Sequence, residues 1–119
     1  MKKIIYVLRK EVAKESEYAD EFYDDAIMGL QWIKQEKPKV VVIDLGLSKV
    51  SGLEMVNIIR SNPVNHHIKI VVTCKVYNKK LAQEAYLAGA DYFIKSPINQ
   101  SILEKILELT ELQENFFEM

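Results

Sequence analysis

The sequence predicts an α/β fold in which an open parallel β-sheet is covered by helices on both faces. Short apolar runs rich in β-branched residues alternate with segments whose apolar residues recur at helical spacing. The runs are continuous rather than alternating, as expected for strands buried on both faces. The chain has 119 residues, so we expect one domain, residues 1–119, around one hydrophobic core.

Four apolar runs are the predicted strands of this sheet. Three contain at least four consecutive residues with few interruptions, and the last run is shorter. In chain order they are Ile4–Leu8, Val40–Ile43, Ile68–Val72 and Tyr92–Ile94.

Four segments between and after these strands have the spacing of amphipathic helices. The first must end before Pro38, since a residue that precedes proline is disfavoured in the α conformation. The second begins after Gly52 and ends before Pro63, and the third is closed by Gly89, a suitable C-cap. The fourth is the long segment after Pro97. In chain order, the apolar stripes of the four segments are Ala26, Leu30 and Ile33; Leu53, Val56 and Ile59; Leu81, Ala82, Ala85 and Tyr86; and Ile102, Leu103, Ile106, Leu107 and Leu109.

Residues 9–23 allow two interpretations. If Tyr18–Tyr23 is a strand, only residues 9–17 connect it to the first strand, whereas a parallel crossover usually needs a dozen or more residues. Alternatively, Glu11–Lys37 is mostly one helical run, because its apolar residues fall near one helical face and its Lys, Glu and Ala favour helix. Either the first helix or the second strand is therefore shortened or missing.

Charge and cysteine content restrict the classes of partner and compartment. Sixteen basic and seventeen acidic residues give a formal net charge of −1, so we expect neither nucleic acid nor a membrane surface as partner. The single cysteine, Cys74, excludes an internal disulfide and suits a reducing compartment. The run Ile4–Leu8 is too short for a signal-peptide core or a membrane span. We therefore expect a cytoplasmic protein.

Charged and polar side chains follow the predicted strands. Arg9 and Lys10 follow the first, Asp44 the second, Thr73 the third and Lys95 the fourth. In open parallel sheets, ligands bind outside the carboxyl ends of the strands, where the strand order reverses. A carboxylate, a hydroxyl and an ammonium at one edge form a site that can hold a phosphoryl group.

These motifs resemble those of response-regulator receiver domains. In that family an aspartate ends a hydrophobic strand and a glycine eight residues later opens the next helix, as Asp44 and Gly52 do here. Thr73 matches the switch hydroxyl of the family, Tyr92 its aromatic switch residue and Lys95 its lysine. The resemblance implies a flavodoxin-like, doubly wound sheet with Asp44 in the phospho-acceptor position.

The sequence departs from the family pattern at the metal-binding carboxylates. Receivers hold Mg²⁺ with an acidic pair just after the first strand, and these positions fall on Leu8 and Arg9, or on Arg9 and Lys10. A cation there repels Mg²⁺ and can pair with Asp44 instead. We therefore expect no cofactor; were Mg²⁺ to bind, Glu11 and Asp44 would be its carboxylate ligands.

The resemblance extends from residue 25 to about residue 109 and implies a role in two-component signal transduction. We expect a pseudo-receiver, a non-enzymatic module that acts through protein–protein contacts with little or no Mg²⁺-dependent phosphorylation. The alternative is a working phospho-switch, in which a histidine kinase phosphorylates Asp44 and Thr73 and Tyr92 respond. A remote alternative is a small enzyme that uses Asp44 and Lys95, although no glycine-rich phosphate loop or nucleophile elbow supports it.

The expected partners are other signalling proteins, either a histidine kinase or a downstream target. A homodimer is also expected, because shortening after the first strand would uncover part of an apolar sheet face, and such faces usually mark interfaces. Leu112, Phe116 and Phe117 add apolar groups near the C-terminus that could cover this face in the same chain or in a second copy.

Overall fold

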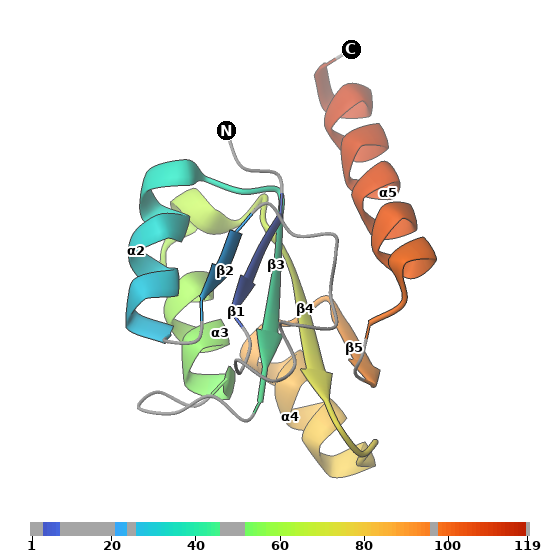
Figure 1. Ribbon diagram of the computed structural model, residues 1–119. Coiled ribbons are helices and arrows are strands. Elements are labelled where there is room, and N and C mark those ends of the chain that lie inside the picture. The colour runs from blue at the N-terminus through green and yellow to red at the C-terminus, as the bar shows by residue number, and fades with distance from the viewer. Residues whose placement is uncertain (1–3, 8–20, 24–25, 46–51, 96–97, 119) are drawn as a thin grey trace.

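Five parallel strands form one sheet in the part of the chain that the structure describes (Figure 1). The computed structural model describes residues 4–7, 21–23, 26–45, 52–95 and 98–118. The strands pair in the order β2-β1-β3-β4-β5, so the strand order reverses between β1 and β3. Their bounds are Ile4–Val7 for β1, Glu21–Tyr23 for β2, Val40–Asp44 for β3, Lys69–Cys74 for β4 and Tyr92–Lys95 for β5.

Helices cover both faces of this sheet (Figure 1). On one face, α2, α3 and α4 enclose the larger hydrophobic cluster, and on the other face α5 packs on a smaller one. A short 3₁₀ helix, η1, connects α3 to β4. The bounds are Ala26–Glu36 for α2, Gly52–Ser61 for α3, Pro63–Asn65 for η1, Lys79–Ala88 for α4 and Gln100–Glu118 for α5.

The central strands are buried on both faces, as their continuous apolar sequences predict. Along β3, Val41 and Ile43 belong to the cluster under α2, α3 and α4, and Val40 and Val42 belong to the cluster under α5. Every residue of β3 is buried. The prediction of a doubly wound parallel sheet is therefore confirmed, and the four apolar runs are four of its strands.

The helix ends follow the local signals in the sequence. Asn78 caps α4, because its side-chain oxygen accepts hydrogen bonds from the amides of Lys80 and Leu81. Gly89 ends α4 with a φ of 118°, a left-handed backbone conformation that residues with a Cβ atom rarely adopt. The α2 helix ends at Glu36, two residues before Pro38, as predicted.

The interpretation of residues 11–37 as one helical run is wrong. Glu21–Tyr23 is a strand that pairs in parallel with β1, and Phe22 stands opposite Tyr6. The second strand is therefore present, with three residues, and α2 begins only at Ala26. Residues 8–20, which include the predicted short connection, lie outside the described part of the chain. The same holds for the uncovered sheet face that was expected to follow from it.

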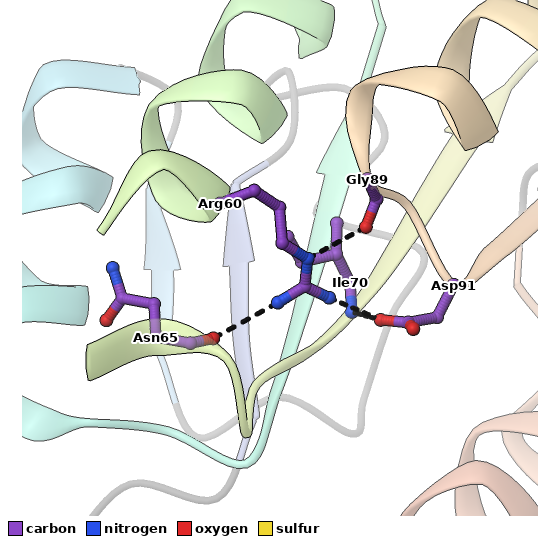
Figure 2. A network of polar contacts seen from close by, with 5 residues as sticks. All are labelled: Arg60, Asn65, Ile70, Gly89 and Asp91. Carbon is purple, nitrogen blue, oxygen red and sulfur yellow. Dashed lines mark hydrogen bonds and ion pairs between the residues drawn. The ribbon is translucent and has the colours of Figure 1, made fainter. Parts of the chain in front are cut away.

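Arg60, in the last turn of α3, joins three segments at the edge of the sheet where the strands begin (Figure 2). Its Nε donates a hydrogen bond to the Gly89 carbonyl oxygen at 2.8 Å, and its Nη1 donates to the Asn65 carbonyl oxygen at 3.1 Å. Its Nη2 lies 2.6 Å from Asp91 Oδ2 as a salt bridge. The same Asp91 oxygen accepts the Ile70 amide at 2.8 Å. One guanidinium thus connects α3 with η1, the end of α4 and, through the Asp91 carboxylate, the start of β4.

The helices of the described segments do not include one that could cross a membrane. None of them combines the necessary length with sufficient apolar character.

Candidate functional site

Asp44 ends β3 at the carboxyl edge of the sheet, next to β1, where the strand order reverses. This is the position at which doubly wound sheets bind their ligands. The residue is 2% exposed, although it is the charged end of an otherwise apolar strand. The structure thus places the predicted phospho-acceptor residue at the expected edge, in a buried position.

Thr73 stands directly beside Asp44, because the two residues are partners in the parallel pairing of β3 with β4. The Thr73 hydroxyl is buried and lies 3.5 Å from the Ile43 carbonyl oxygen, a long hydrogen bond in which the hydroxyl donates. The Leu45 amide donates a hydrogen bond to the Thr73 carbonyl oxygen at 3.1 Å. The end of β4 therefore holds the backbone on both sides of Asp44.

Lys95 and Cys74 extend the site by one strand. They are partners in the pairing of β4 with β5, and Lys95 is exposed while Cys74 is buried. The Cys74 thiol donates a hydrogen bond to the Val76 carbonyl oxygen at 3.2 Å. Burial raises the pKa of this thiol, the Asp44 carboxylate raises it further, and the Lys95 ammonium opposes both effects. The thiol therefore lies within electrostatic reach of both charges.

The raised pKa of Cys74 predicts a pH dependence of stability. A thiol with a raised pKa in the folded state contributes stability below its ordinary pKa of 9.0, and this contribution is lost as the pH rises through the raised value. Between about pH 7 and about pH 10, the wild type should therefore lose more free energy of unfolding than Cys74→Ala does. Urea unfolding of both proteins across this range measures the difference, and parallel profiles would refute the prediction.

Tyr92, the predicted aromatic switch residue, begins β5 and pairs with Val71 of β4. It is half-buried against the cluster under α5, which includes Val71. Alternate residues of a strand face the same side of a sheet, so Thr73 lies on the same face as Val71 and Tyr92. The two predicted switch residues are thus on one face, on neighbouring strands.

Gly52 allows α3 to begin against the backbone that follows Asp44. A Cβ atom on Gly52 would lie 2.9 Å from the Asp44 carbonyl oxygen and 2.9 Å from the Leu45 Cα. These are backbone atoms, which cannot turn aside as a long side chain can. The spacing of eight residues between Asp44 and Gly52 therefore has a steric cause.

The residues predicted to replace the acidic pair, Leu8, Arg9 and Lys10, lie outside the described part of the chain, as does Glu11. Among the residues that are described, no group of three or more His, Cys, Asp or Glu side chains could hold a metal ion. The described site thus brings together a carboxylate and a hydroxyl, with an ammonium one strand further on. Such a set can accept a phosphoryl group and neutralise part of its charge.

Two features of the site edge were not predicted from sequence. From the sequence, Cys74 indicated only the lack of an internal disulfide and a reducing compartment, and its position between Asp44 and Lys95 depends on the lateral order of the strands. The amide of Leu45 also contributes, through its bond to Thr73. Backbone amides have no residue-specific signal in a sequence, so only the pairing register could reveal this contact.

Comparison with known proteins identifies the family to which this fold and site belong. Residues 2–108 match the response regulator receiver domain family, so the chain belongs to that family. It is 29% identical over 113 residues to the transcriptional regulatory protein GlnL of Bacillus subtilis (strain 168), an alignment that covers 90% of the chain and 35% of GlnL. The chain therefore spans about a third of the length of this relative.

Solved structures show the same fold. The signal receiver domain of a DNA binding response regulator protein from Colwellia psychrerythraea 34H matches with a TM-score of 0.76 at 21% identity, over 94% of this chain and 98% of that one. A CheY-like response regulator receiver domain protein from Methanospirillum hungatei JF-1 matches with a TM-score of 0.71 at 24% identity, over 95% and 97% of the two chains. The predicted receiver fold is confirmed.

Proposed function

We propose that this receiver domain is a pseudo-receiver, which acts through contacts with other signalling proteins and undergoes little or no Mg²⁺-dependent phosphorylation. The observation that carries the proposal is the absence of an acidic pair from residues 8–10, where the sequence has Leu8, Arg9 and Lys10. Receivers need a divalent cation at that position to neutralise the transferring phosphoryl group. Two positive side chains at these positions would attract the Asp44 carboxylate and repel Mg²⁺.

The burial of Asp44 supports the same proposal. An acyl phosphate forms when the carboxylate attacks a phosphoryl donor, so the carboxylate must be accessible to that donor. Asp44 is only 2% exposed, and the buried side chains of Thr73 and Cys74 follow one another on the neighbouring strand. This burial is expected to hold the Asp44 carboxylate among neighbouring groups and to limit the access of a kinase to it.

A working phospho-switch is the second candidate, and the pairing of Asp44 with Thr73 favours it. In this function a histidine kinase phosphorylates Asp44, and the added negative charge and acceptor oxygens attract the Thr73 hydroxyl and the Lys95 ammonium. The half-buried Tyr92, on the same face as Thr73, would then pass the change to a downstream target. The two functions differ in whether Asp44 takes up a phosphoryl group at all.

Phosphorylation with a small donor distinguishes the two functions. The protein is incubated with Mg²⁺ and acetyl phosphate, and intact-mass measurement reports the fraction carrying one phosphoryl group. The pseudo-receiver predicts no modification above that of the control Asp44→Asn, which removes the acceptor. Stoichiometric modification that is lost in Asp44→Asn would establish the phospho-switch and refute the pseudo-receiver.

Restoring the acidic pair tests the cause. The double variants Leu8→Asp/Arg9→Asp and Arg9→Asp/Lys10→Asp cover the two alignments of the family positions with this chain. One of them should gain Mg²⁺-dependent phosphorylation, because it replaces a repelling cation with a metal ligand. If both remain unmodified and folded, the missing acidic pair is not what prevents the reaction.

A further inference from the structure

An open groove lies between α2 and the end of α3, on the helical face opposite α5. Leu30 and Lys34 of α2 form one wall, and Ile58 of α3 and Val64 of η1 form the other. Ile58 is 47% exposed and Val64 is 59% exposed, so both leave apolar surface outside the core. The volume of the groove is about 250 Å³.

The apolar surface continues along α2 beyond the groove. Ile27 is 49% exposed and lies one helical turn before Leu30, which lines the groove. Sites for small molecules are usually clefts of about 300–1,000 Å³ that enclose most of the ligand. This hollow is smaller and open, and the apolar surface is longer than the hollow itself. The shape therefore favours a protein segment that lays apolar side chains along α2 over a small, enclosed ligand.

Hydrogen bonds hold the η1 wall of the groove in place. Arg60 Nη1 donates to the Asn65 carbonyl oxygen at 3.1 Å (Figure 2), and the Asn65 side-chain amide donates to the Ile59 carbonyl oxygen at 3.1 Å. The Val64 amide donates to Asn62 Oδ1 at 3.1 Å. Because this wall is already ordered, a partner that binds it loses less conformational freedom of the protein.

The described side chains that line the groove carry positive charge. They include Lys34 and Lys37, both exposed, and no aspartate or glutamate. The Lys37 amide donates to the Ile33 carbonyl oxygen at 3.0 Å, as in a helix, so the two lysines lie about one helical turn apart. Two carboxylates one turn apart on a second helix have the same spacing.

The backbone of Lys37 gives an independent reason to assign a role to its side chain. Its φ is 47°, a left-handed conformation that glycine or asparagine adopts at lower cost. The end of α2 before Pro38 accounts for this conformation but not for the lysine. Residues in strained conformations are concentrated at ligand contacts. The chain thus places a cation at the groove where the backbone disfavours a side chain.

We propose that the groove between α2 and α3 binds an acidic amphipathic helix of a partner protein. Apolar side chains of that helix pack between Leu30 and Ile58, and two of its carboxylates, one turn apart, pair with Lys34 and Lys37. The positive charge of the groove selects this partner over a neutral or basic one. The proposal rests on the proposed function only in that the domain acts through another protein.

A designed peptide tests this contact. It is an alanine-based helix of about 16 residues, with a leucine stripe flanked by two glutamates one turn apart, and it is titrated into the isotope-labelled full chain. Amide resonances of the groove should shift saturably, whereas that of Leu87 on α4 should not. The groove reporters are Lys34, Lys37, Ile58 and Val64. A peptide with glutamine in place of both glutamates should bind about fivefold more weakly, since two exposed ion pairs are lost.

Matched variants locate the contact. Lys34→Gln/Lys37→Gln should weaken binding of the glutamate peptide about fivefold and leave the glutamine peptide unchanged. The control Lys79→Gln/Lys80→Gln, in the first turn of α4, should change neither affinity. Lys37→Gly removes the cation together with the backbone strain, so it should weaken binding of the glutamate peptide without lowering the urea midpoint. Ile58→Gln should weaken binding of both peptides.

Several results would overturn the proposal. One is the lack of a saturable shift at millimolar peptide, and another is equal affinity for the two peptides. Hexanoate tests a small ligand: shifts of the same amides at lower concentration than the peptide requires would assign the groove to a small carboxylate instead. Shifts of these amides that depend on protein concentration alone would assign it to a second copy. Phosphorylation of Asp44 by acetyl phosphate would refute the pseudo-receiver and leave the groove contact standing.

Discussion

Replacing Arg60 by methionine is expected to lower the free energy of unfolding by about 2–4 kcal/mol, one of the two largest effects anticipated for a single substitution in this chain. The substitution removes the hydrogen bonds to Gly89, Asn65 and Asp91 together. It also leaves the Asp91 carboxylate without its cation while that carboxylate still accepts the Ile70 amide. The Arg60 and Asp91 side chains are 19% and 28% exposed, so solvent screens only part of the loss. Urea denaturation followed by circular dichroism measures the change.

Two further variants separate the charge of Arg60 from its geometry. Arg60→Lys keeps the charge but donates from a single nitrogen, which cannot reach the three acceptors that Nε, Nη1 and Nη2 contact, so it should recover only part of the lost stability. In a double-mutant cycle with Asp91→Asn, the coupling energy should be about 1–2 kcal/mol, since the two side chains are in direct contact. An Arg60→Met variant within about 0.5 kcal/mol of the wild type would show that the network contributes little.

Replacing Gly52 by alanine is expected to destabilise the fold by about 1–3 kcal/mol, the cost typical of overpacking. Helix propensity predicts the opposite sign, because alanine is favoured over glycine in helices by about 1 kcal/mol. Steric overlap is expected to dominate, since the new Cβ would lie 2.9 Å from the carbonyl oxygen of Asp44 and the Cα of Leu45. This overlap can be relieved only if α3 or the backbone after Asp44 moves.

Asn57→Ala is the matched control, because Asn57 is an exposed position within the same helix. There the propensity term acts alone, so this variant should be unchanged or slightly more stable. Chemical denaturation gives the sign of the change in the free energy of unfolding for each variant. The amide chemical shifts of Asp44, Leu45 and Thr73 should change in Gly52→Ala but not in Asn57→Ala. A stabilised Gly52→Ala would contradict the steric argument.

The central strands were predictable because burial on both faces requires continuous apolar sequence. β3 and β4 follow this pattern, and their observed bounds differ from the predicted runs by one or two residues at an end. β2 was not predictable in the same way. In the described sheet it is an edge strand of three residues beside β1, and its sequence Glu-Phe-Tyr contains no apolar run. Periodicity in that region therefore fitted a helix equally well.

The candidate site was predictable as a set of strand ends but not as a geometry. The sequence shows which strand each site residue terminates. The distance of that residue from Asp44, however, depends on the lateral order of the strands. Thr73 is a direct partner of Asp44, while Lys95 stands one strand further away beside Cys74. The ion pair of Arg60 with Asp91 spans 31 residues of sequence, and no local pattern relates the two.

We propose that the protein's own cations, rather than a metal ion, neutralise the pocket around Asp44. The most direct test is a Mg²⁺ titration of the wild type, observed through the amide resonances of Asp44, Leu45, Thr73 and Cys74. We predict no saturable change in these resonances, and a saturable change in the double-aspartate variant that restores the acidic pair. Saturable Mg²⁺ binding by the wild type, centred on Asp44 and lost in Asp44→Asn, would contradict the claim.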